Sequence, residues 1–495
     1  MRALLTRFPA FIAFVLGVLS VLCFAPFSLG WGLPLILAAL FGLWQQATPR
    51  QAAWRGTCFG LGLFLAGVYW LNISLTVYGG MPLPLALVGT SLFALYLSIF
   101  PALAAYVSTR WMTSPYYRAL LAGCVWPLTE VLRGTLLTGF PWLVSGYSQV
   151  DTPLAGLIPV GGVYAASWGV SLTAALITLG VQMPAHRKRA CFAVLVLWLG
   201  AAGLRQVVWT QPVGKPLRIS LLQGNIAQDV KWDPAHAMLS YQTYAAQIAA
   251  APGQLIVTPE TALPHVWPQI PPDFLADTAA TLRQKNAALL LGVVEYDGHQ
   301  FANSAVLLGT PTPQWYRKAH LVPFGEYLPL RSAFAWVLDI LHIPLGDMSR
   351  GAENQAAITY GGQRILMNIC YEDVFGEDLK SRIPSSTLLM NISNLAWFGD
   401  TIALDQHLQI GRVRALEAGR PALTATNTGV TAVIDAQGAV LARLPTFKTA
   451  TLSYTVDGHT GLTPFARFGH RWLVLIGLAI IGLSFSHRKA RLRHN

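Results

Sequence analysis

The segment RILMNICYED (residues 364–373) changes from apolar to polar at a single cysteine, Cys370. Its leading residues predict a short, largely buried strand that ends where Tyr371 and Glu372 begin a polar turn. The end of a buried strand often carries catalytic groups, because it is rigid and open to a substrate. Taken alone, the segment fits equally well a cysteine that only fills space in the core.

Two other apolar segments end in a charged residue. LIVTPE (255–260) ends in Glu260, and Lys318 follows a strand pair predicted near residues 304–316. Burying a carboxylate is costly unless it has a partner or a chemical role. Acyl transfer through a thioester needs a base for the thiol and a donor for the tetrahedral oxyanion. Glu260 suits the first role and Lys318 the second, although each alone is also typical of a surface charge.

Strand and helix patterns alternate through residues 217–456. We expect strands at 217–223, 255–258, 288–296, 304–308, 364–370 and 387–391, and helices at 234–251, 272–285 and 404–419. This alternation predicts an α/β domain with largely buried strands. The domain contains no glycine-rich nucleotide loop and no HExxH motif, so we expect neither a cofactor nor a metal.

The remainder of the chain is apolar. Over all 495 residues, 54% are hydrophobic and 11% are charged, less than half of the roughly 25% that is typical of soluble proteins. A membrane span needs about 20 apolar residues. We expect about eight spans, at residues 8–25, 30–47, 57–74, 84–108, 119–138, 157–183, 191–209 and 469–487. The composition therefore argues against a purely soluble protein.

The formal net charge of +12 is unevenly distributed. Residues 211–460 contain 17 Lys and Arg against 20 Asp and Glu, so the whole positive excess lies in the apolar part. Most of its basic residues fall in loops on one side of the eight-span arrangement, which the positive-inside rule makes cytoplasmic. We expect spans one to seven in residues 1–209, a polar domain on the outer face in 210–468, and span eight with a basic tail in 469–495. Both termini are then cytoplasmic, and the charge does not indicate a nucleic-acid partner.

Glu130 and Arg133 stand three residues apart in an apolar segment, so on a helix they share a face. They either form an ion pair near the outer interface or contact a polar lipid headgroup, since charges at membrane depth are often functional. The segment GFPWLVSGYS (139–148) follows. Its glycine, proline and aromatic residues are typical of an interfacial loop, and we expect Trp142 in it to meet lipid.

The segment SAFAWVLDILHIP (332–344) gathers large apolar side chains within a mostly polar domain. Core packing explains it as well as a mobile arm that enters the outer leaflet and admits lipid. In the second case Trp336 and Leu338 act at a gate.

The surroundings of the three candidate residues resemble a known family. TPETALP around Glu260, KAHLVPFGEYLP beginning at Lys318 and NICYED around Cys370 resemble the Glu–Lys–Cys triad of the carbon–nitrogen hydrolase (nitrilase) superfamily. That resemblance implies a four-layer αββα sandwich. With QGNIAQDVKW, AWFGD, RALEAGRPALTATNTG and the multi-span N-terminal part, the whole chain resembles the bacterial apolipoprotein N-acyltransferases.

The resemblance implies roles for individual residues. Cys370 resembles the nucleophile, Glu260 the general base and Lys318 the lysine that stabilises the oxyanion. Further residues resemble supporting or entrance positions of the family, namely Glu326, Tyr371, Glu372 and Trp232. One position departs from the family pattern, because Leu395 stands where an aspartate is expected before AWFGD.

The resemblance also implies a two-step, ping-pong reaction at the bacterial inner membrane, with the catalytic domain in the periplasm. Cys370 takes the sn-1 acyl chain of a phospholipid, typically phosphatidylethanolamine, as a thioester. The acyl chain then passes to the α-amino group of an S-diacylglyceryl cysteine at a lipoprotein N-terminus. No cofactor is implied.

Three alternatives remain open at this level. A membrane-tethered amidase of the same superfamily would use the same triad with water as the acceptor. A transporter with an accessory domain would need charged residues in several spans. A glycerolipid acyltransferase of the His–four–Asp type is matched only by the spacing of His342 and Asp347, a pattern that is frequent by chance.

Overall fold

A computed structural model describes the chain except residues 1–7, 113, 234, 329–347 and 494–495. The chain forms two compact units. One comprises residues 1–69, 84–208 and 467–495, and the other comprises residues 70–83 and 209–466. Residues 70–83 thus fold with the polar domain, which the hydropathy pattern did not indicate.

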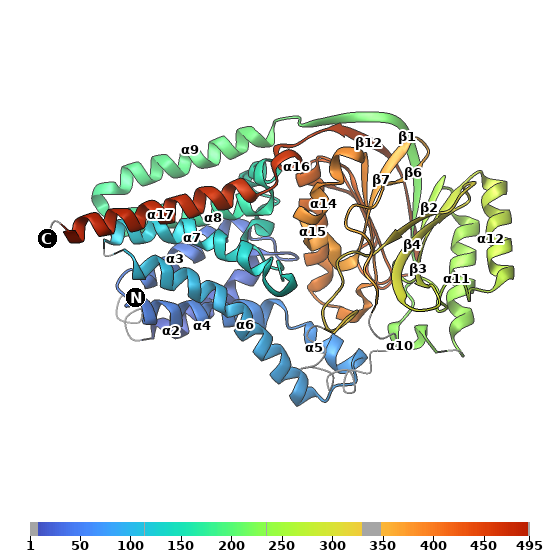
Figure 1. Cartoon of the computed structure of the whole chain (residues 1–495), viewed down its shortest axis with the longest axis horizontal. Coiled ribbons are helices and arrows are strands. Elements are labelled where there is room, and N and C mark those ends of the chain that lie inside the picture. The colour runs from blue at the N-terminus through green and yellow to red at the C-terminus, as the bar shows by residue number, and fades with distance from the viewer. Residues whose placement is uncertain (1–7, 113, 234, 329–347, 494–495) are drawn as a thin grey trace. The chain divides into compact units, whose positions relative to one another are not determined.

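The first unit is helical (Figure 1). Its helices are α2 (Pro9–Ser20), α3 (Leu33–Trp44), α4 (Pro49–Gly67), α6 (Leu83–Arg110), α7 (Pro115–Arg133), α8 (Ile158–Gln182), α9 (Arg187–Arg205) and α17 (Arg471–Arg493). Helix α4 begins at a capping box, because the Thr48 side chain accepts from the backbone of Gln51 and the Gln51 side chain accepts from the backbone of Thr48. Helices α2 and α4 pack closely through glycine, since a Cβ atom at Gly17 or Gly62 would overlap the facing backbone carbonyl.

A helix lies in each of the eight segments predicted to span. Within the described residues, Leu83–Arg110 and Pro153–Gln182 are long and apolar enough to cross a membrane. The pair Pro49–Gly67 and Leu71–Tyr78, bent by 60°, adds a third if it counts as one span. The number eight is therefore not confirmed, because helices such as α2 and α3 have 12 residues, fewer than the roughly 17 that a span needs.

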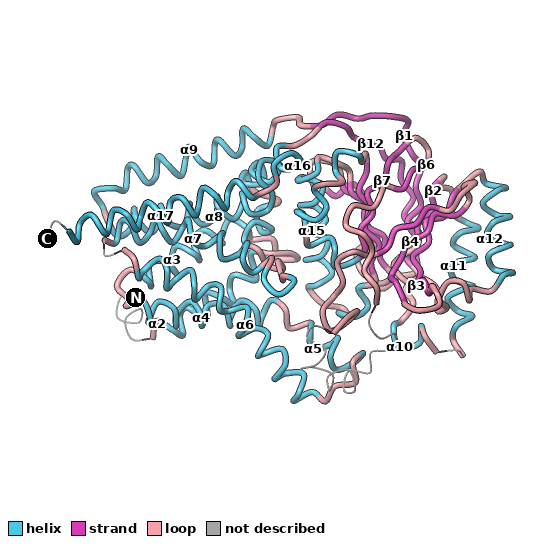
Figure 2. The backbone as a smooth tube through the Cα atoms, in the orientation of Figure 1, coloured by secondary structure: helices cyan, strands magenta, loops and turns pink. Residues whose placement is uncertain are grey.

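Two six-stranded sheets form the body of the second unit (Figure 2). The first has the order β12 (Ala450–Gly461), β1 (Thr210–Gln223), β2 (Leu255–Val257), β3 (Ala288–Tyr296), β4 (Phe301–Leu308), β5 (Gln314–Arg317). The second has the order β11 (Val440–Arg443), β10 (Ala432–Ile434), β9 (Ala422–Thr426), β8 (Leu388–Ser393), β7 (Gln363–Ile369), β6 (Ile358–Tyr360). Strands β1–β2–β3 and β7–β8–β9 are parallel, so their carboxyl ends lie together within each sheet.

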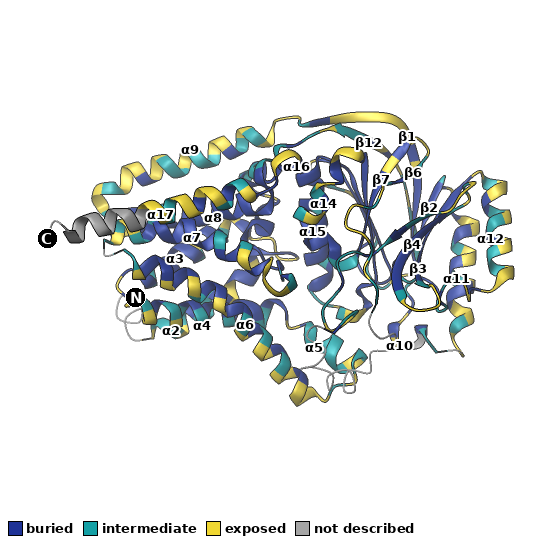
Figure 3. Cartoon of the chain, viewed as in Figure 1, coloured by how far each residue is buried: buried dark blue, intermediate teal, exposed yellow. Residues whose placement is uncertain are grey.

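The inner faces of the sheets share one apolar core. Alternate residues of β1, such as Leu217, Ile219 and Leu221, pack there against residues of β7 and β8, such as Met367 and Met390. The central strands, such as β3, β8 and β9, are accordingly buried along most of their length, whereas the edge strands β11 and β12 are more exposed (Figure 3).

Helices cover the outer faces of the two sheets. α11 (Ala237–Ala250) and α12 (Pro272–Lys285) pack on the first sheet, and α15 (Ala403–Ala418) packs on the second. The expected four-layer αββα sandwich is confirmed.

Most of the predicted elements are present, and β3 and α12 have the predicted bounds. The first strand begins at Thr210 rather than at 217, because it continues past an irregularity between Val213 and Leu217 and pairs with β12. Strands β6 and β9–β12 were not predicted. β12 (ATLSYTVDGHTG) gives a weak signal because polar residues and glycine interrupt it.

The segment that includes α5 (Leu71–Ile73) lies against the AWFG turn at 396–399, within the second unit. The indole N–H of Trp70 donates to Oε1 of Gln406 at 3.3 Å, and the Trp70 ring lies 4.4 Å from that of Phe398. The Ser74 hydroxyl donates to the carbonyl of Trp397 at 2.7 Å. These contacts anchor the turn, which directly follows β8.

Candidate active site

Cys370 stands at the carboxyl end of β7 with φ +52°, a backbone conformation that is costly for a residue with a side chain. The conformation turns the chain from the strand into a 3₁₀ turn, Cys370–Val374. Burial raises the pKa of the Cys370 thiol well above its ordinary value, and the charge of Glu260 raises it further, while Lys318 opposes both. The thiol is therefore neutral at rest and needs a base before it can attack.

Glu260 follows β2 and is held by three elements. Its Oε1 accepts from Nδ2 of Asn303 at 2.7 Å and from Nζ of Lys318 at 3.4 Å. Its Oε2 accepts from the backbone N–H of Asn394 at 2.7 Å. The charge of Glu260 acts directly on the Cys370 thiol, as does that of Lys318. The structure thus brings the predicted base and the predicted nucleophile together.

Lys318 follows β5 and is 1% exposed. Its Nζ lies 2.8 Å from Oε1 of Glu326 and 3.4 Å from Oε1 of Glu260. Burial alone would lower the pKa of Lys318, but the charges of Glu326 and Glu260 raise it above its ordinary value. The side chain therefore carries a permanent positive charge beside Cys370, whose thiol it also influences.

Glu326 and Asn303 complete this group. Oε1 of Glu326 accepts from Nδ2 of Asn303 at 2.9 Å, and its Oε2 accepts from the backbone N–H of Val322 at 2.8 Å. The Asn303 amide thereby bridges Glu260 and Glu326. Asn303 was missed from the sequence. The signal that could have found it is a buried amide within the apolar strand β4.

Glu372 is buried and joins the Cys370 turn to the Lys318 loop. Its carboxylate accepts from the backbone N–H of Ile369 at 2.7 Å and of Ala319 at 2.8 Å. The hydroxyl of Tyr316 donates to it at 2.9 Å. Glu372 thus lies between the Cys370 turn and the Lys318 loop, and its supporting role stays a prediction, while the neighbouring Tyr371 side chain packs edge-on against Phe375.

The backbone carbonyl of Cys370 is also held by a buried polar side chain of the neighbouring strand β8. It accepts from Nδ2 of Asn391 at 3.2 Å, and Asn391 lies beside Asn368 in the paired strands β8 and β7. The amide of Asn368 donates to Oδ1 of Asp373 at 3.1 Å. This buried polar layer supports the strained turn at Cys370, and the sequence analysis did not identify it.

Leu395, where the resemblance led us to expect an aspartate, leaves no polar gap. Its side chain is buried in an apolar cluster with Leu404 and Val430 and lies against Gly429. The contact with Glu260 comes instead from the preceding backbone N–H of Asn394. This turn therefore binds Glu260 through a backbone N–H and not through the side chain of residue 395.

The structure describes the predicted entrance residue but not the predicted gate residues. Trp232 is half-buried at the end of α10 (Gln228–Lys231), and its entrance role stays a prediction. Trp336 and Leu338 lie outside the described residues, as do His342 and Asp347. In the part of the chain that the structure describes, no group of three or more His, Cys, Asp or Glu side chains could hold a metal ion.

Glu130, Arg133 and Trp142 are all buried within the helical unit. Oε1 of Glu130 accepts from the backbone N–H of Ser145 at 2.9 Å and from Nε1 of Trp126 at 3.2 Å. One guanidinium nitrogen of Arg133 donates to the carbonyls of Phe140 and Trp142, each at 2.6 Å. Helix α7 thus holds the 139–149 loop through two charged side chains.

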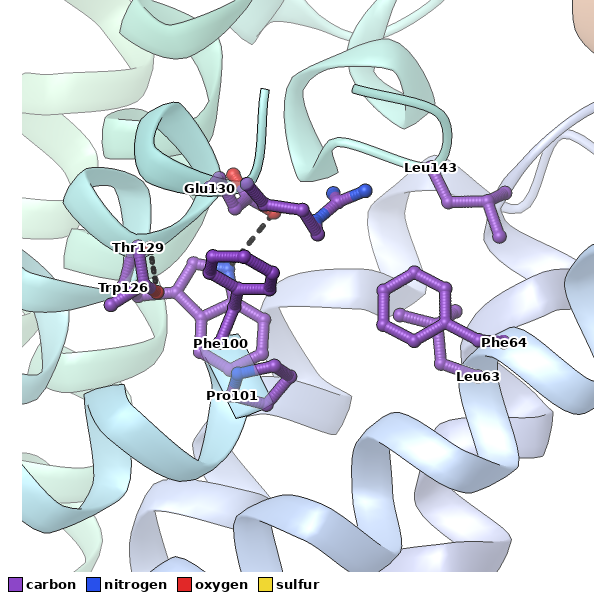
Figure 4. A pocket seen from close by; sticks show the side chains of 9 residues that line it. Leu63, Phe64, Phe100, Pro101, Trp126, Thr129, Glu130 and Leu143 are labelled. Carbon is purple, nitrogen blue, oxygen red and sulfur yellow. Dashed lines mark hydrogen bonds between the residues drawn. The ribbon is translucent and has the colours of Figure 1, made fainter. Parts of the chain in front are cut away.

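Glu130 and Arg133 also line a cavity of about 10 Å³, with Phe64, Phe100 and Leu143 among its other walls (Figure 4). That volume admits about one water molecule, which is too little for a lipid headgroup. The geometry favours the structural role of the two charges, and lipid contact stays a prediction.

Arg133→Leu is expected to lower the stability of the helical unit by about 2 kcal/mol or more, because two buried carbonyls lose their donor. Thermal unfolding in detergent measures this, with Arg133→Lys as the milder control. A variant that unfolds like the wild type but binds phospholipid more weakly would instead support the headgroup role.

The fold and the site define a class. Two helix-covered sheets carry a glutamate, a lysine and a cysteine in contact near strand ends, which is the arrangement of a carbon–nitrogen hydrolase domain. Residues 218–465 match the family model for carbon–nitrogen hydrolases, and residues 16–176 match that of the apolipoprotein N-acyltransferase N-terminal domain.

The chain belongs to the apolipoprotein N-acyltransferase family. It is similar to apolipoprotein N-acyltransferases of Nitrosomonas europaea (46% identity, 97% of this chain and 98% of the relative) and Ralstonia nicotianae (43%, 98% and 94%).

Solved structures also resemble the chain. A carbon–nitrogen hydrolase superfamily protein from Xanthomonas campestris has a TM-score of 0.38 at 21% identity, over 49% of this chain and 91% of that one. An amidase from Nesterenkonia sp. has a TM-score of 0.37 at 20% identity, over 50% and 92%.

Proposed function

We propose that this chain is an apolipoprotein N-acyltransferase that works through a thioester at Cys370. The acyl donor is the sn-1 chain of a phospholipid such as phosphatidylethanolamine, and the acceptor is the α-amino group of an S-diacylglyceryl cysteine. The observation that carries the proposal is the contact of Cys370, Glu260 and Lys318 near three strand ends, in a chain whose full-length relatives bear this name.

In the first half-reaction Glu260 takes the proton of the Cys370 thiol as sulfur attacks the ester carbonyl. A C–S bond forms, and the negative charge that develops on the carbonyl oxygen is stabilised by the Lys318 ammonium. The ester C–O bond then breaks, and the lysophospholipid leaves with the proton that Glu260 returns. Because the thiol is neutral at rest, removal of its proton accompanies the attack.

In the second half-reaction the lipoprotein amine attacks the thioester carbonyl. A C–N bond forms while Glu260 takes a proton from the amine, and Lys318 again faces the oxyanion. The C–S bond breaks, and the sulfur recovers a proton from Glu260. One carboxylate thus serves both steps, and the enzyme returns to its starting state.

The supporting residues keep these groups in place. Glu326 holds the Lys318 ammonium, and Asn303 fixes the spacing of the two carboxylates. Glu372 joins the Cys370 turn to the Lys318 loop, with Tyr371 beside it, and Trp232 stands at the entrance.

The membrane arrangement is part of the proposal. We assign residues 1–209 to spans one to seven, 210–468 to a periplasmic catalytic domain, and 469–495 to span eight and a cytoplasmic tail, in the bacterial inner membrane. The helices in all eight segments and the one-sided basic residues support this. Both substrates are lipid-anchored, and an anchored enzyme need not extract an acyl chain at about 0.8 kcal/mol per CH₂.

The fate of a labelled acyl chain tests the proposal. Membranes that contain the wild-type chain receive alkyne-tagged phosphatidylethanolamine and a diacylglyceryl-apolipoprotein. The tag is expected on the α-amino group of the lipoprotein, where hydroxylamine does not remove it. Release of the tag only as free fatty acid would contradict N-acyl transfer and identify a membrane-tethered hydrolase instead.

A further inference from the structure

A second lysine lies next to the candidate base. Lys231 ends helix α10 and is 2% exposed, although lysine is almost never fully buried unless it is paired. Its Nζ donates to Oγ1 of Thr261 at 2.9 Å, and the charge of Glu260 acts on it. This ammonium neither transfers a proton nor stabilises the oxyanion in the two proposed half-reactions.

The hydrogen bonding of Lys231 is incomplete. An ammonium has three donors, and within the described part of the chain that of Lys231 has one hydrogen-bond acceptor, the Thr261 hydroxyl. One neutral acceptor does not offset the loss of water around a buried charge. The remaining compensation comes from the carboxylate of Glu260, which raises the pKa of Lys231 against the effect of burial.

The residue that Lys231 holds is strained. Thr261 has φ +45°, which is unfavourable for a β-branched side chain, and it directly follows Glu260. A hydrogen bond to its hydroxyl fixes the turn from which the Glu260 side chain projects. A shift of this turn would move the base away from the Cys370 thiol.

The charges at the site indicate a second role for Lys231, which is electrostatic. Glu260 and Glu326 bring two negative charges to one ammonium, that of Lys318, and Lys318 lies nearer to Glu326 than to Glu260. Lys231 supplies a second positive charge next to Glu260. Glu260 thereby interacts with two ammonium groups, those of Lys318 and Lys231.

We propose that Lys231 is a positioning residue of the acyl transfer: it fixes the turn of Glu260 and Thr261 and places a positive charge beside the Glu260 carboxylate, so that Glu260 is held ready to accept a proton in both half-reactions. This inference rests on the proposed function. The ionisable groups around Lys231 are Glu260, Asp229 on its own helix, and Lys318 with Glu326 beyond Glu260.

The pH dependence follows from the burial of Lys231. Burial lowers the pKa of Lys231 to about 8, with Glu260 opposing. Because the lowered pKa belongs to a cation, the positive charge is present below about pH 8 and is lost as the pH rises through that value. Arginine stays protonated throughout this range, so it keeps the charge.

The test measures the rate at which Cys370 is loaded with the acyl chain of alkyne-tagged phosphatidylethanolamine, in detergent-solubilised full-length protein, between about pH 6 and about pH 10. The variants are Lys231→Met and Lys231→Arg. Lys285→Met is the matched control, because the Lys285 ammonium donates to the backbone carbonyl of Ala251, away from the site. Thermal unfolding of each variant is measured in parallel.

Wild type and Lys285→Met are expected to load more slowly above about pH 8. Lys231→Met is expected to load about ten- to a hundredfold more slowly at neutral pH, without that alkaline decline. Lys231→Arg is expected to keep most of the neutral rate, with its decline moved to higher pH.

Three results would overturn the inference while wild type still loads. They are an unchanged rate in Lys231→Met, a slow Lys231→Met that retains the alkaline decline, and a Lys231→Arg profile identical to that of wild type. The arginine variant decides the question even if Lys231→Met fails to fold. Absence of loading in the wild type at every pH would instead refute the proposed function.

Discussion

Cys370→Ala is expected to load no acyl chain and to transfer none to a lipoprotein amine. The reason is chemical, because the proposed route forms a bond to sulfur, and Cys370 is the one cysteine in the sequence from residue 209 to residue 466. Removal of a nucleophile from such a group of residues lowers kcat by about 10⁴-fold or more. The fold is expected to persist, since alanine fills most of the space of the thiol and leaves the held carbonyl of residue 370 in place.

The measurement is a pulse of alkyne-tagged phosphatidylethanolamine in intact membranes, followed by hydroxylamine. Wild type is expected to form a hydroxylamine-labile acyl-protein, and Cys370→Ala is not. Cys191→Ala is the matched control, because Cys191 is an exposed cysteine of helix α9 in the other unit. Its labelling is expected to equal that of wild type. Acyl transfer by Cys370→Ala would end the thioester mechanism.

The strand ends that carry Cys370, Glu260 and Lys318 were predictable because each is a local signal. An apolar strand followed at once by a polar or charged residue is visible in a window of about ten residues. The structure confirms those strands and brings the three side chains together. Spacing along the chain does not say which strand ends meet. The prediction that the three residues form a single site therefore depended on the resemblance to a family.

The residues that were missed depend on which strands become neighbours. Asn303 bridges two carboxylates that are 66 residues apart in the sequence, and Asn394, which directly follows β8 of the other sheet, reaches Glu260 through its backbone N–H. Lys231 is buried only because the α10 segment folds over the Glu260 turn. Asn303 at least stands within an apolar strand, whereas no local pattern distinguishes Asn394 and Lys231 from surface residues, so their contacts required the tertiary structure.

The fold was predicted where hydrophobic periodicity is strong and missed where it is interrupted. The parallel inner strands are continuous apolar runs, whereas β12 pairs along β1 with polar residues at many positions. The packing of residues 70–83 with the polar domain was also missed. Their apolar character is typical of a span, yet Trp70 is buried by Gln406 and Phe398 of the second unit.

Lys318→Met is expected to have the second large effect, on activity and on stability together. Activity falls because the oxyanion loses its cationic donor, a loss worth about 10²–10³-fold in kcat. The free energy of unfolding falls by about 3–5 kcal/mol at neutral pH, because Glu260 and Glu326 remain buried without their shared partner. Loading assays and chemical denaturation in detergent measure the two effects separately.

The raised pKa of Lys318 determines how the stability contribution of this lysine depends on pH. In the wild type the pKa of Lys318 is raised above its ordinary value, so the stabilisation linked to the lysine's own charge is fully present below the ordinary lysine pKa and is lost only as the pH rises through the raised value. Lys318→Met lacks this ammonium, so its stability deficit should stay constant from neutral pH up to the ordinary lysine pKa, where the wild-type side chain keeps its charge.

A double variant separates the structural contribution of Lys318 from its chemical one. Lys318→Met with Glu326→Gln removes one positive and one negative charge, and Asn303 still holds Glu260. Most of the lost stability should return, whereas acyl loading should stay as low as in Lys318→Met alone, because the oxyanion still lacks its donor. Recovery of both quantities together would show that Lys318 acts only by holding the carboxylates apart, and the oxyanion role would then have to be assigned to another group.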